Sequence, residues 1–297
     1  MTWIIWLYPS PALRELGPAE PDTTIVVPVW GAYGGSTLLE ALASLRAQDP
    51  PARILVVDNA SDEPLPDLGD AEVVVAPRRL TVGAARNLGL ERVRTPYVLF
   101  WDADDLMLPG TLPFLREQLA GDDGVIAVAS AIMEEEPRMP HRWPRPWTAP
   151  LTRLPKVFAL AHSVWSLFPS TGSTIMRSAA VKESGGYADA NSGEDWVLGV
   201  SLAFRGRLEI HSRPGRVYRR RVGSLWERRR APRHHLRHGA AVRERLRSDP
   251  GIPRWAKQLV PAIAVLQVIA VVAVRPLAKA GRALIQGGRG EQLEPRR

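Results

Sequence analysis

The chain has 297 residues, 45% hydrophobic and 24% charged, which suits one large globular domain with an appendage or two smaller domains. Its formal net charge of +8 indicates an anionic partner: a nucleotide, a nucleic acid or an acidic lipid. The absence of cysteine excludes disulfides and thiolate metal sites and fits a reducing compartment. Residues 1–22 lack the basic segment of a secretion signal and contain several prolines, so we expect an N-terminal arm there.

The first half of the chain alternates strand-like and helix-like patterns. The predicted strands are 23–29, 53–57, 72–76 and 96–101, each short, apolar and mostly β-branched. Between them we expect one helix capped by Ser36 or Thr37 and a second over about 83–93. Such alternation predicts right-handed parallel crossovers and an α/β sheet with helices on both faces.

The next part of the chain is predicted to complete this domain. We expect a helix over 112–119, strands at 125–130 and 173–176, a helix opening at 194, and two closing strands at 207–211 and 217–221. Segment 134–155 is rich in proline and is predicted to be a long loop or lid. Its tryptophan and arginine side chains either contact a sugar or phosphate, or hold the loop to the surface.

Two acidic clusters follow predicted strands, at Asp58 and at Asp102, Asp104 and Asp105. In α/β sheets, ligands bind at the carboxyl ends of the strands, so both clusters are placed where a nucleotide would bind. An extended backbone would point Asp102 and Asp104 to the same side. Carboxylates there suit Mg²⁺ or Mn²⁺, which keep open positions for phosphate oxygens. The alternative is an acidic turn that caps the following helix.

Four landmarks occur in order along the chain. They are Val-Pro-Val-Trp, Val-Val-Asp-Asn-Ala-Ser-Asp, Gly-Ala-Ala-Arg-Asn-Leu-Gly-Leu followed by Phe-Trp-Asp-Ala-Asp-Asp, and Gly-Glu-Asp-Trp. Together, over 23–225, they resemble the family 2 glycosyltransferases of the GT-A fold. The resemblance implies a Rossmann-like mixed sheet with helices on both faces. It also implies an enzyme that moves a hexosyl group from a nucleotide sugar to an acceptor hydroxyl, with inversion and with Mg²⁺ or Mn²⁺.

The resemblance also implies roles for single residues. The nucleotide-sugar-binding residues would be Pro28, Asp58, Arg86, Asn87, Asp102 and Arg221. The metal ligand would be Asp104, with Asp102 close to the metal. Asp195 would be the general base, with Glu194 beside it.

Each of these positions also has a purely structural interpretation. Asp58 would cap a turn, and Arg86 would lie on a helix surface and pair with Glu91 or with solvent. Glu194 and Asp195 would stabilise the first turn of a helix through its dipole. All four landmarks together favour the functional interpretation for Asp58 and Arg86.

The sequence departs from the family pattern at Arg221. There the family carries a histidine ahead of Gly-Ser, whereas this chain has Arg-Val-Gly-Ser. Arginine cannot ligate a cation, but it pairs bidentately with phosphate. Either Arg221 replaces the missing ligand with a positive charge, or the correspondence is shifted by some residues.

Residues 226–297 are predicted to form a basic helical region. Segment 259–274 is apolar except for Gln267 and has basic flanks. Sixteen helical residues reach about 24 Å, which is short for a bilayer core of roughly 30 Å. The segment would therefore lie on an anionic membrane surface, or form a buried core helix.

These observations predict an inverting, metal-dependent glycosyltransferase at the cytoplasmic face of the cell membrane, acting on a lipid-linked or cell-envelope glycan acceptor. One alternative is a transferase with a soluble acceptor. Another is a non-catalytic protein of the same fold that binds membrane or nucleic acid through its arginine-rich region. The apolar segment next to that region makes nucleic acid the less favoured partner. A mere binding protein would not need all four of Asp58, Asp102, Asp104 and Asp195.

Overall fold

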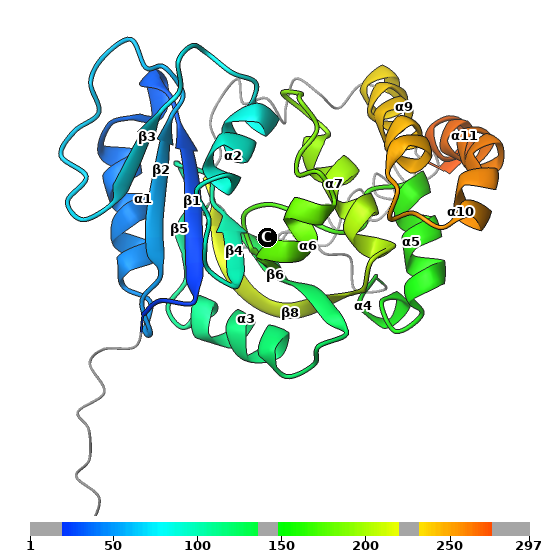
Figure 1. The fold of residues 1–297 in the computed structure, drawn as a ribbon, viewed down its shortest axis with the longest axis horizontal. Coiled ribbons are helices and arrows are strands. Elements are labelled where there is room, and N and C mark those ends of the chain that lie inside the picture. Colours follow the sequence, from blue (N-terminus) through cyan, green and yellow to red (C-terminus); the bar gives the residue numbers. More distant parts are fainter. Residues whose placement is uncertain (1–19, 136–147, 220–231, 275–297) are drawn as a thin grey trace, which may run out of the picture.

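The computed structural model describes residues 20–135, 148–219 and 232–274, and this part of the chain contains a mixed eight-stranded sheet (Figure 1). The strand order is β3-β2-β1-β4-β7-β6-β8-β5. The strands are β1 (Thr23–Val29), β2 (Arg53–Asp58), β3 (Glu72–Val75), β4 (Tyr97–Phe100), β5 (Leu106–Met107), β6 (Val125–Glu134), β7 (Thr174–Arg177) and β8 (Arg207–Tyr218). The first four are parallel, as predicted, and β7 is antiparallel to both its neighbours.

Helices cover both faces of the sheet, which confirms the predicted layering. The helices are η1 (Gly31–Tyr33), α1 (Ser36–Arg46), α2 (Val82–Leu90), α3 (Thr111–Ala120), α4 (Thr148–Leu151), α5 (Pro155–Val164), α6 (Ser178–Glu183), α7 (Glu194–Ala203), α9 (Pro232–Ser248), α10 (Arg254–Gln258), α11 (Val260–Ile269) and η2 (Ala270–Val274). Because side chains alternate along a strand, Val27 packs with α1 and α3 on one face, and Val26 packs with α2 on the other.

Pro28 lies near the end of β1 without disturbing the sheet. Pairing of β1 with β4 ends at Val26–Phe100, before the proline, while pairing with β2 continues through Pro28–Val57. The missing N–H of Pro28 therefore costs no hydrogen bond between β1 and β4.

Several predicted boundaries are wrong in detail. The cap of α1 is Gly35 rather than a hydroxyl residue. Segment 134–155 is not one loop, because β6 reaches Glu134 and α4 and the start of α5 lie inside it. Its residues 136–147, which carry the tryptophans and arginines of the predicted lid, lie outside the described residues.

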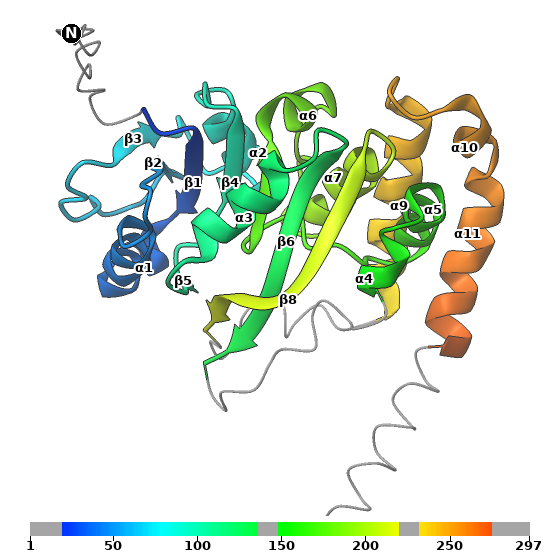
Figure 2. The ribbon, with the colours of Figure 1, turned by 90° about the horizontal axis from the view of Figure 1, so that it is seen from below.

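The two predicted closing strands are one continuous strand, β8. Proline and glycine at 214–215 suggest a break, but β8 passes through them with shifts in its register against β6 (Figure 2). Gly215 lies against Ser130 so closely that a Cβ would overlap the serine hydroxyl. The glycine therefore permits close packing rather than ending the strand.

The C-terminal helices α9, α10 and α11 pack onto α7. They share a buried cluster made of Trp196, Val197, Val200, Val242, Leu246, Ile252, Ala256, Val260 and Ile263. Residues 232–274 therefore rest on the domain that contains the sheet through a common core, and the predicted boundary near 225 lies outside the described residues. Within the described ranges, no helix is both long and apolar enough to cross a membrane.

Candidate active site

The chain turns sharply after β4, and this turn carries the predicted acidic motif. Trp101 is buried, and its indole N–H donates to the backbone oxygen of Asp105 at 3.0 Å. The backbone N–H of Asp105 donates to the oxygen of Asp102 at 3.3 Å. Because the backbone is turned here, the expectation that Asp102 and Asp104 project from one side of an extended strand is wrong.

Two buried arginines hold the carboxylates of this turn. Arg86, on α2, donates to Asp102 Oδ1 at 2.9 Å and to Glu194 Oε1 at 2.6 Å. Arg216, on β8, donates to Asp102 Oδ2 and to Asp105 Oδ2, each at 2.5 Å. Asp102 therefore lies between two guanidinium groups and joins α2, β4, α7 and β8 into one network. The structural interpretation of Arg86, a surface pair with Glu91, is wrong.

The network shifts the pKa values of its carboxyl groups in different directions. Burial alone would raise the pKa of Asp102, but Arg216 and Arg86 hold it below its usual value. Burial raises the pKa of Asp105 to about 7, although Arg216 acts in the opposite direction. Arg86 Nε and Glu194 Oε2 are buried and have no hydrogen-bond partner among the described residues. Such atoms in a native core are where a ligand or a water is expected.

Asp195 lies at the start of α7, beside this network. Gly193 precedes the helix with φ +76°, a conformation that favours glycine, and the N–H of Trp196 donates to Asp195 Oδ1 at 2.8 Å. Burial and the neighbouring charge of Glu194 raise the pKa of Asp195 to about 6, against the lowering effect of Arg86. A carboxylate with a pKa near neutrality is suited to proton transfer.

Sequence reasoning placed Asp105 in the acidic cluster without giving it a role, and it missed Arg216 and selected Arg221, which lies outside the described residues. Four of the six residues from 216 to 221 are arginine, and periodicity does not distinguish one arginine from the next. No local sequence signal marks Arg216. In the fold, Gly172 has φ +75° and lies so close to Arg216 that a Cβ would overlap the guanidinium.

We expect Gly172→Ala to lower the free energy of unfolding by about 1–3 kcal/mol. Alanine is strained at a φ of +75°, and its Cβ would displace the guanidinium of Arg216. Urea denaturation measures this. Gly31→Ala is the matched control, since a Cβ there has nothing within 4 Å. Equal stability of the two variants would contradict the placement of Arg216 over Gly172.

Asp58 lies at the carboxyl end of β2, next to the end of β1. Its Oδ1 accepts from the N–H of Ser61 at 3.0 Å, so it caps the turn that follows, as the structural interpretation expected. Near the same edge the indole of Trp30 is 42% exposed, and the guanidinium of Arg79 lies 4.4 Å from its ring centre. This flat aromatic surface beside the ends of β1 and β2 was not selected from the sequence.

Asn87 lies one residue after Arg86 on α2. Its amide nitrogen donates to the oxygen of Tyr187 at 2.9 Å, and its amide oxygen accepts from the N–H of the same residue at 2.8 Å. The side chain therefore holds the loop before α7, and in this structure it acts by positioning Tyr187. Direct contact of Asn87 with a nucleotide sugar stays a prediction.

A divalent cation fits the charge of this site. Five carboxylates, those of Asp102, Asp104, Asp105, Glu194 and Asp195, gather around the two guanidinium groups of Arg86 and Arg216. Within the described part, no three acidic or histidine side chains form a ready-made metal site. Both carboxylate oxygens of Asp102 accept hydrogen bonds from arginines. Mg²⁺ is often held by one or two carboxylates and substrate phosphates, which Asp104 and a bound diphosphate would supply.

The model of the family described as glycosyl transferase family 2 matches residues 24–182. The chain belongs to this family. A pre-mycofactocin glycosyltransferase of Mycobacterium tuberculosis is 31% identical over 198 residues, 64% of this chain and 40% of that protein. A teichoic acid poly(glycerol phosphate) polymerase of Staphylococcus epidermidis is 28% identical over 125 residues, 39% of this chain and 17% of its own length. The chain thus spans less than half the length of these relatives.

Solved structures confirm the GT-A fold predicted for this family 2 member. S. aureus TarS 1–349, crystallised in complex with UDP-GlcNAc, has a TM-score of 0.61 at 17% identity, covering 84% of this chain and 72% of that one. Longer S. aureus TarS gives the same TM-score at 18% identity, covering 84% of this chain and 43% of that one. The family match includes Asp58, Arg86 and Asp104, but it ends before α7 and β8. The assignment of Asp195 and Arg216 to the site is therefore based on the geometry of the structure alone.

Proposed function

We propose that this protein transfers a hexosyl group, with inversion, from a nucleoside diphosphate sugar to a hydroxyl of a glycan or lipid-linked acceptor. One observation carries the proposal. A carboxylate of raised pKa, Asp195, lies beside the Arg86–Asp102–Arg216 network at the sheet edge where nucleotides bind. The UDP-GlcNAc complex of a protein of the same fold supports the donor class, and the teichoic acid polymerase supports a cell-envelope acceptor.

The donor is oriented by groups on both sides of the network. Asp58 and the exposed ring of Trp30 lie where the nucleobase would bind, since both follow parallel strands that end side by side. The diphosphate would lie towards Asp104, with Arg86 and Arg216 supplying positive charge nearby. When a divalent cation is bound there, it neutralises charge on the diphosphate.

Asp195 acts on the acceptor. Its ionised carboxylate takes the proton of the acceptor hydroxyl while that oxygen forms a bond to the anomeric carbon. The bond from that carbon to the diphosphate oxygen breaks, and its electron pair leaves with the diphosphate. A single displacement from the opposite face inverts the anomeric centre. The buried guanidinium groups stabilise the developing charge without reorganising, because carboxylates already fix them.

Screening nucleotide sugars by thermal shift, with and without Mn²⁺, tests the donor class. A ligand at 100 times its dissociation constant stabilises a protein by about 2.7 kcal/mol. A nucleoside diphosphate sugar that raises the melting temperature should also be consumed when an acceptor is supplied. If no nucleoside diphosphate or its sugar shifts the melting temperature, the proposed function fails.

We expect Asp104→Ala to abolish the Mn²⁺-dependent part of nucleoside diphosphate binding, because the metal would lose its carboxylate ligand. Isothermal titration calorimetry with UDP, with Mn²⁺ and with EDTA, measures this. Asp123→Ala is the control, since that aspartate is fully exposed at the opposite end of β6. Unchanged affinity and metal dependence in Asp104→Ala would show that the metal is held elsewhere.

The alternative of a non-catalytic nucleic-acid-binding protein is not favoured by α9. Arg245 donates to the backbone oxygens of Ser184 and Gly186, and Arg243 donates to Gln267. These arginines hold helices together rather than presenting a free basic surface. We propose that the acceptor is met at the cytoplasmic face of a membrane, and the observations given next support the contact with a membrane surface.

A further inference from the structure

The outer side of α11 and η2 is apolar and exposed. The inner side buries Val260, Ile263, Gln267 and Val271, spaced as one face of a helix. The outer side exposes Leu259, Val265, Leu266, Val268, Ile269 and Val272, at 38% to 67%. Segment 259–274 is therefore neither a fully buried core helix nor an ordinary amphipathic one. Soluble surfaces seldom expose so continuous an apolar strip without a partner.

The segments that carry this strip and the neighbouring α4 and α5 are basic and contain no acidic residue. Segments 148–182 and 250–274, which include α4, α5, α10 and α11, contain no Asp or Glu. Arg153, Lys156 and Arg254 are exposed. A cavity of about 530 Å³ lies between the start of α5 and α10, with Arg153, Lys156, Phe204 and Trp255 in its wall. We call the exposed apolar residues of α10, α11 and η2, with these three cations, the docking face.

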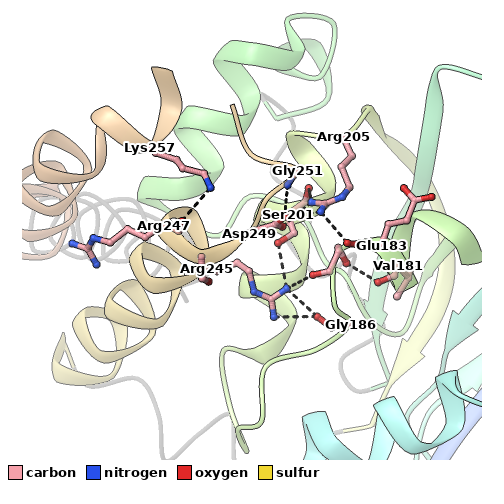
Figure 3. Close-up of polar contacts among 12 residues, drawn as sticks. Val181, Glu183, Gly186, Ser201, Arg205, Arg245, Arg247, Asp249, Gly251 and Lys257 are labelled. Atoms are coloured by element: carbon pink, nitrogen blue, oxygen red, sulfur yellow. Dashed lines mark hydrogen bonds and ion pairs between the residues drawn. The ribbon is translucent and has the colours of Figure 1, made fainter. Parts of the chain in front are cut away.

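The docking face is held rigidly on the domain. Asp249, just after α9, accepts from both terminal nitrogens of Arg205, at 2.6 and 2.7 Å (Figure 3). Lys257 on α10 donates to the oxygen of Arg247 at 3.1 Å, and Gln267 on α11 donates to that of Ser163 at 2.8 Å. These bonds fix which side of α11 faces outward.

The docking face also lies at one extreme of the molecule. In both views α11 forms the edge farthest from β3 (Figures 1 and 2). In Figure 2 the end of α11 and the ends of β6 and β8 lie on the same, lower side. Arg216 is near the end of β8, so this part of the candidate site lies on the same side of the molecule as the end of α11.

We propose that the docking face binds the surface of an anionic lipid bilayer. The exposed apolar residues enter the boundary between headgroups and acyl chains, with Trp255 at the interface, as in interfacial helices. Arg153, Lys156 and Arg254 contact anionic headgroups. A second copy of the chain is a poorer occupant, because it would bring like charges together with no acid to pair them. This inference deepens the proposed function, in which the acceptor is met at a membrane, and it can fail separately because its test needs neither donor nor catalysis.

Co-sedimentation of the full chain with vesicles tests the proposal. Vesicles of phosphatidylcholine with phosphatidylglycerol should bind it, vesicles of phosphatidylcholine alone should bind it much less, and salt should weaken binding. Val265→Asp with Ile269→Asp should reduce binding at least roughly tenfold, because charge would have to enter the apolar boundary. Lys156→Glu with Arg254→Glu should do the same by reversing two charges.

Matched controls keep the test specific. Val73→Asp changes an apolar residue of similar exposure on β3, at the far edge of the sheet, and Arg92→Glu reverses an exposed charge beyond α2. Both should bind vesicles like the unchanged chain, and all variants should retain its melting temperature. The proposal is overturned if the unchanged chain stays in the supernatant with anionic vesicles. It is also overturned if Val265→Asp with Ile269→Asp converts a dimer to a monomer in sedimentation velocity while vesicle binding is unaltered.

Discussion

Asp195→Asn should lower the turnover number by about two to four orders of magnitude, the range expected when a general base is lost, and should leave donor affinity nearly unchanged. An amide cannot accept the proton of the acceptor hydroxyl, but it can keep the hydrogen bond from the N–H of Trp196. Initial-rate kinetics give the turnover number, and calorimetry with UDP gives the affinity. Asp189→Asn is the control, because Asp189 lies six residues before Asp195, is exposed, and accepts a hydrogen bond from the hydroxyl of Thr81.

The pH dependence supplies a second readout for Asp195. Its pKa is raised to about 6, and only the ionised form accepts a proton, so turnover should fall as the pH drops through about 6. The residual rate of Asp195→Asn should lack this acid limb. If Asp195→Asn also loses donor binding, or if its residual rate keeps the acid limb of the unchanged enzyme, Asp195 supports structure instead.

The sequence predicts the first half of the fold well because its signals there are local. Strands β1 to β4 are short apolar runs separated by helical patterns, and the acidic motif falls directly after β4. Parallel connection then places Asp58 and Asp102 at one edge of the sheet. Asp195 is selected only through the resemblance carried by Gly-Glu-Asp-Trp, because a carboxylate in the first turn of a helix is equally explained by the helix dipole.

The rest could not be predicted because it depends on contacts between distant segments. Arg216 pairs with Asp105 and Asp102, which lie 111 and 114 positions earlier in the chain. No periodic pattern marks Arg216 among its basic neighbours. The turn at 102–105 is set by the indole of Trp101, which a strand pattern treats as one more apolar residue. The single long β8 depends on a glycine that fits against Ser130.

Arg216→Met should lower the free energy of unfolding at pH 8 by about 3–5 kcal/mol, the usual result of removing one partner of a buried ion pair. Asp105 is fully buried, and without the guanidinium its charge keeps one hydrogen-bond donor among the described residues, the N–H of Arg219 at 2.9 Å. Arg213→Met is the control, because Arg213 lies three residues earlier on β8 and is exposed, with its guanidinium 4.8 Å from the ring of Phe114. Urea denaturation of both variants measures the difference.

The defect of Arg216→Met should also depend on pH, with a definite sign. Burial already raises the pKa of Asp105 to about 7, and losing Arg216 removes the largest effect that lowers it. A carboxyl group whose folded-state pKa lies above its unfolded value binds an extra proton on folding, so its contribution to stability is lost as the pH rises through that interval. The variant should therefore lose more stability at pH 8 than at pH 5, and Asp105→Asn added to Arg216→Met should restore part of it at pH 8. A defect independent of pH, or no larger than that of Arg213→Met, would show that Arg216 does not hold the charge of this site.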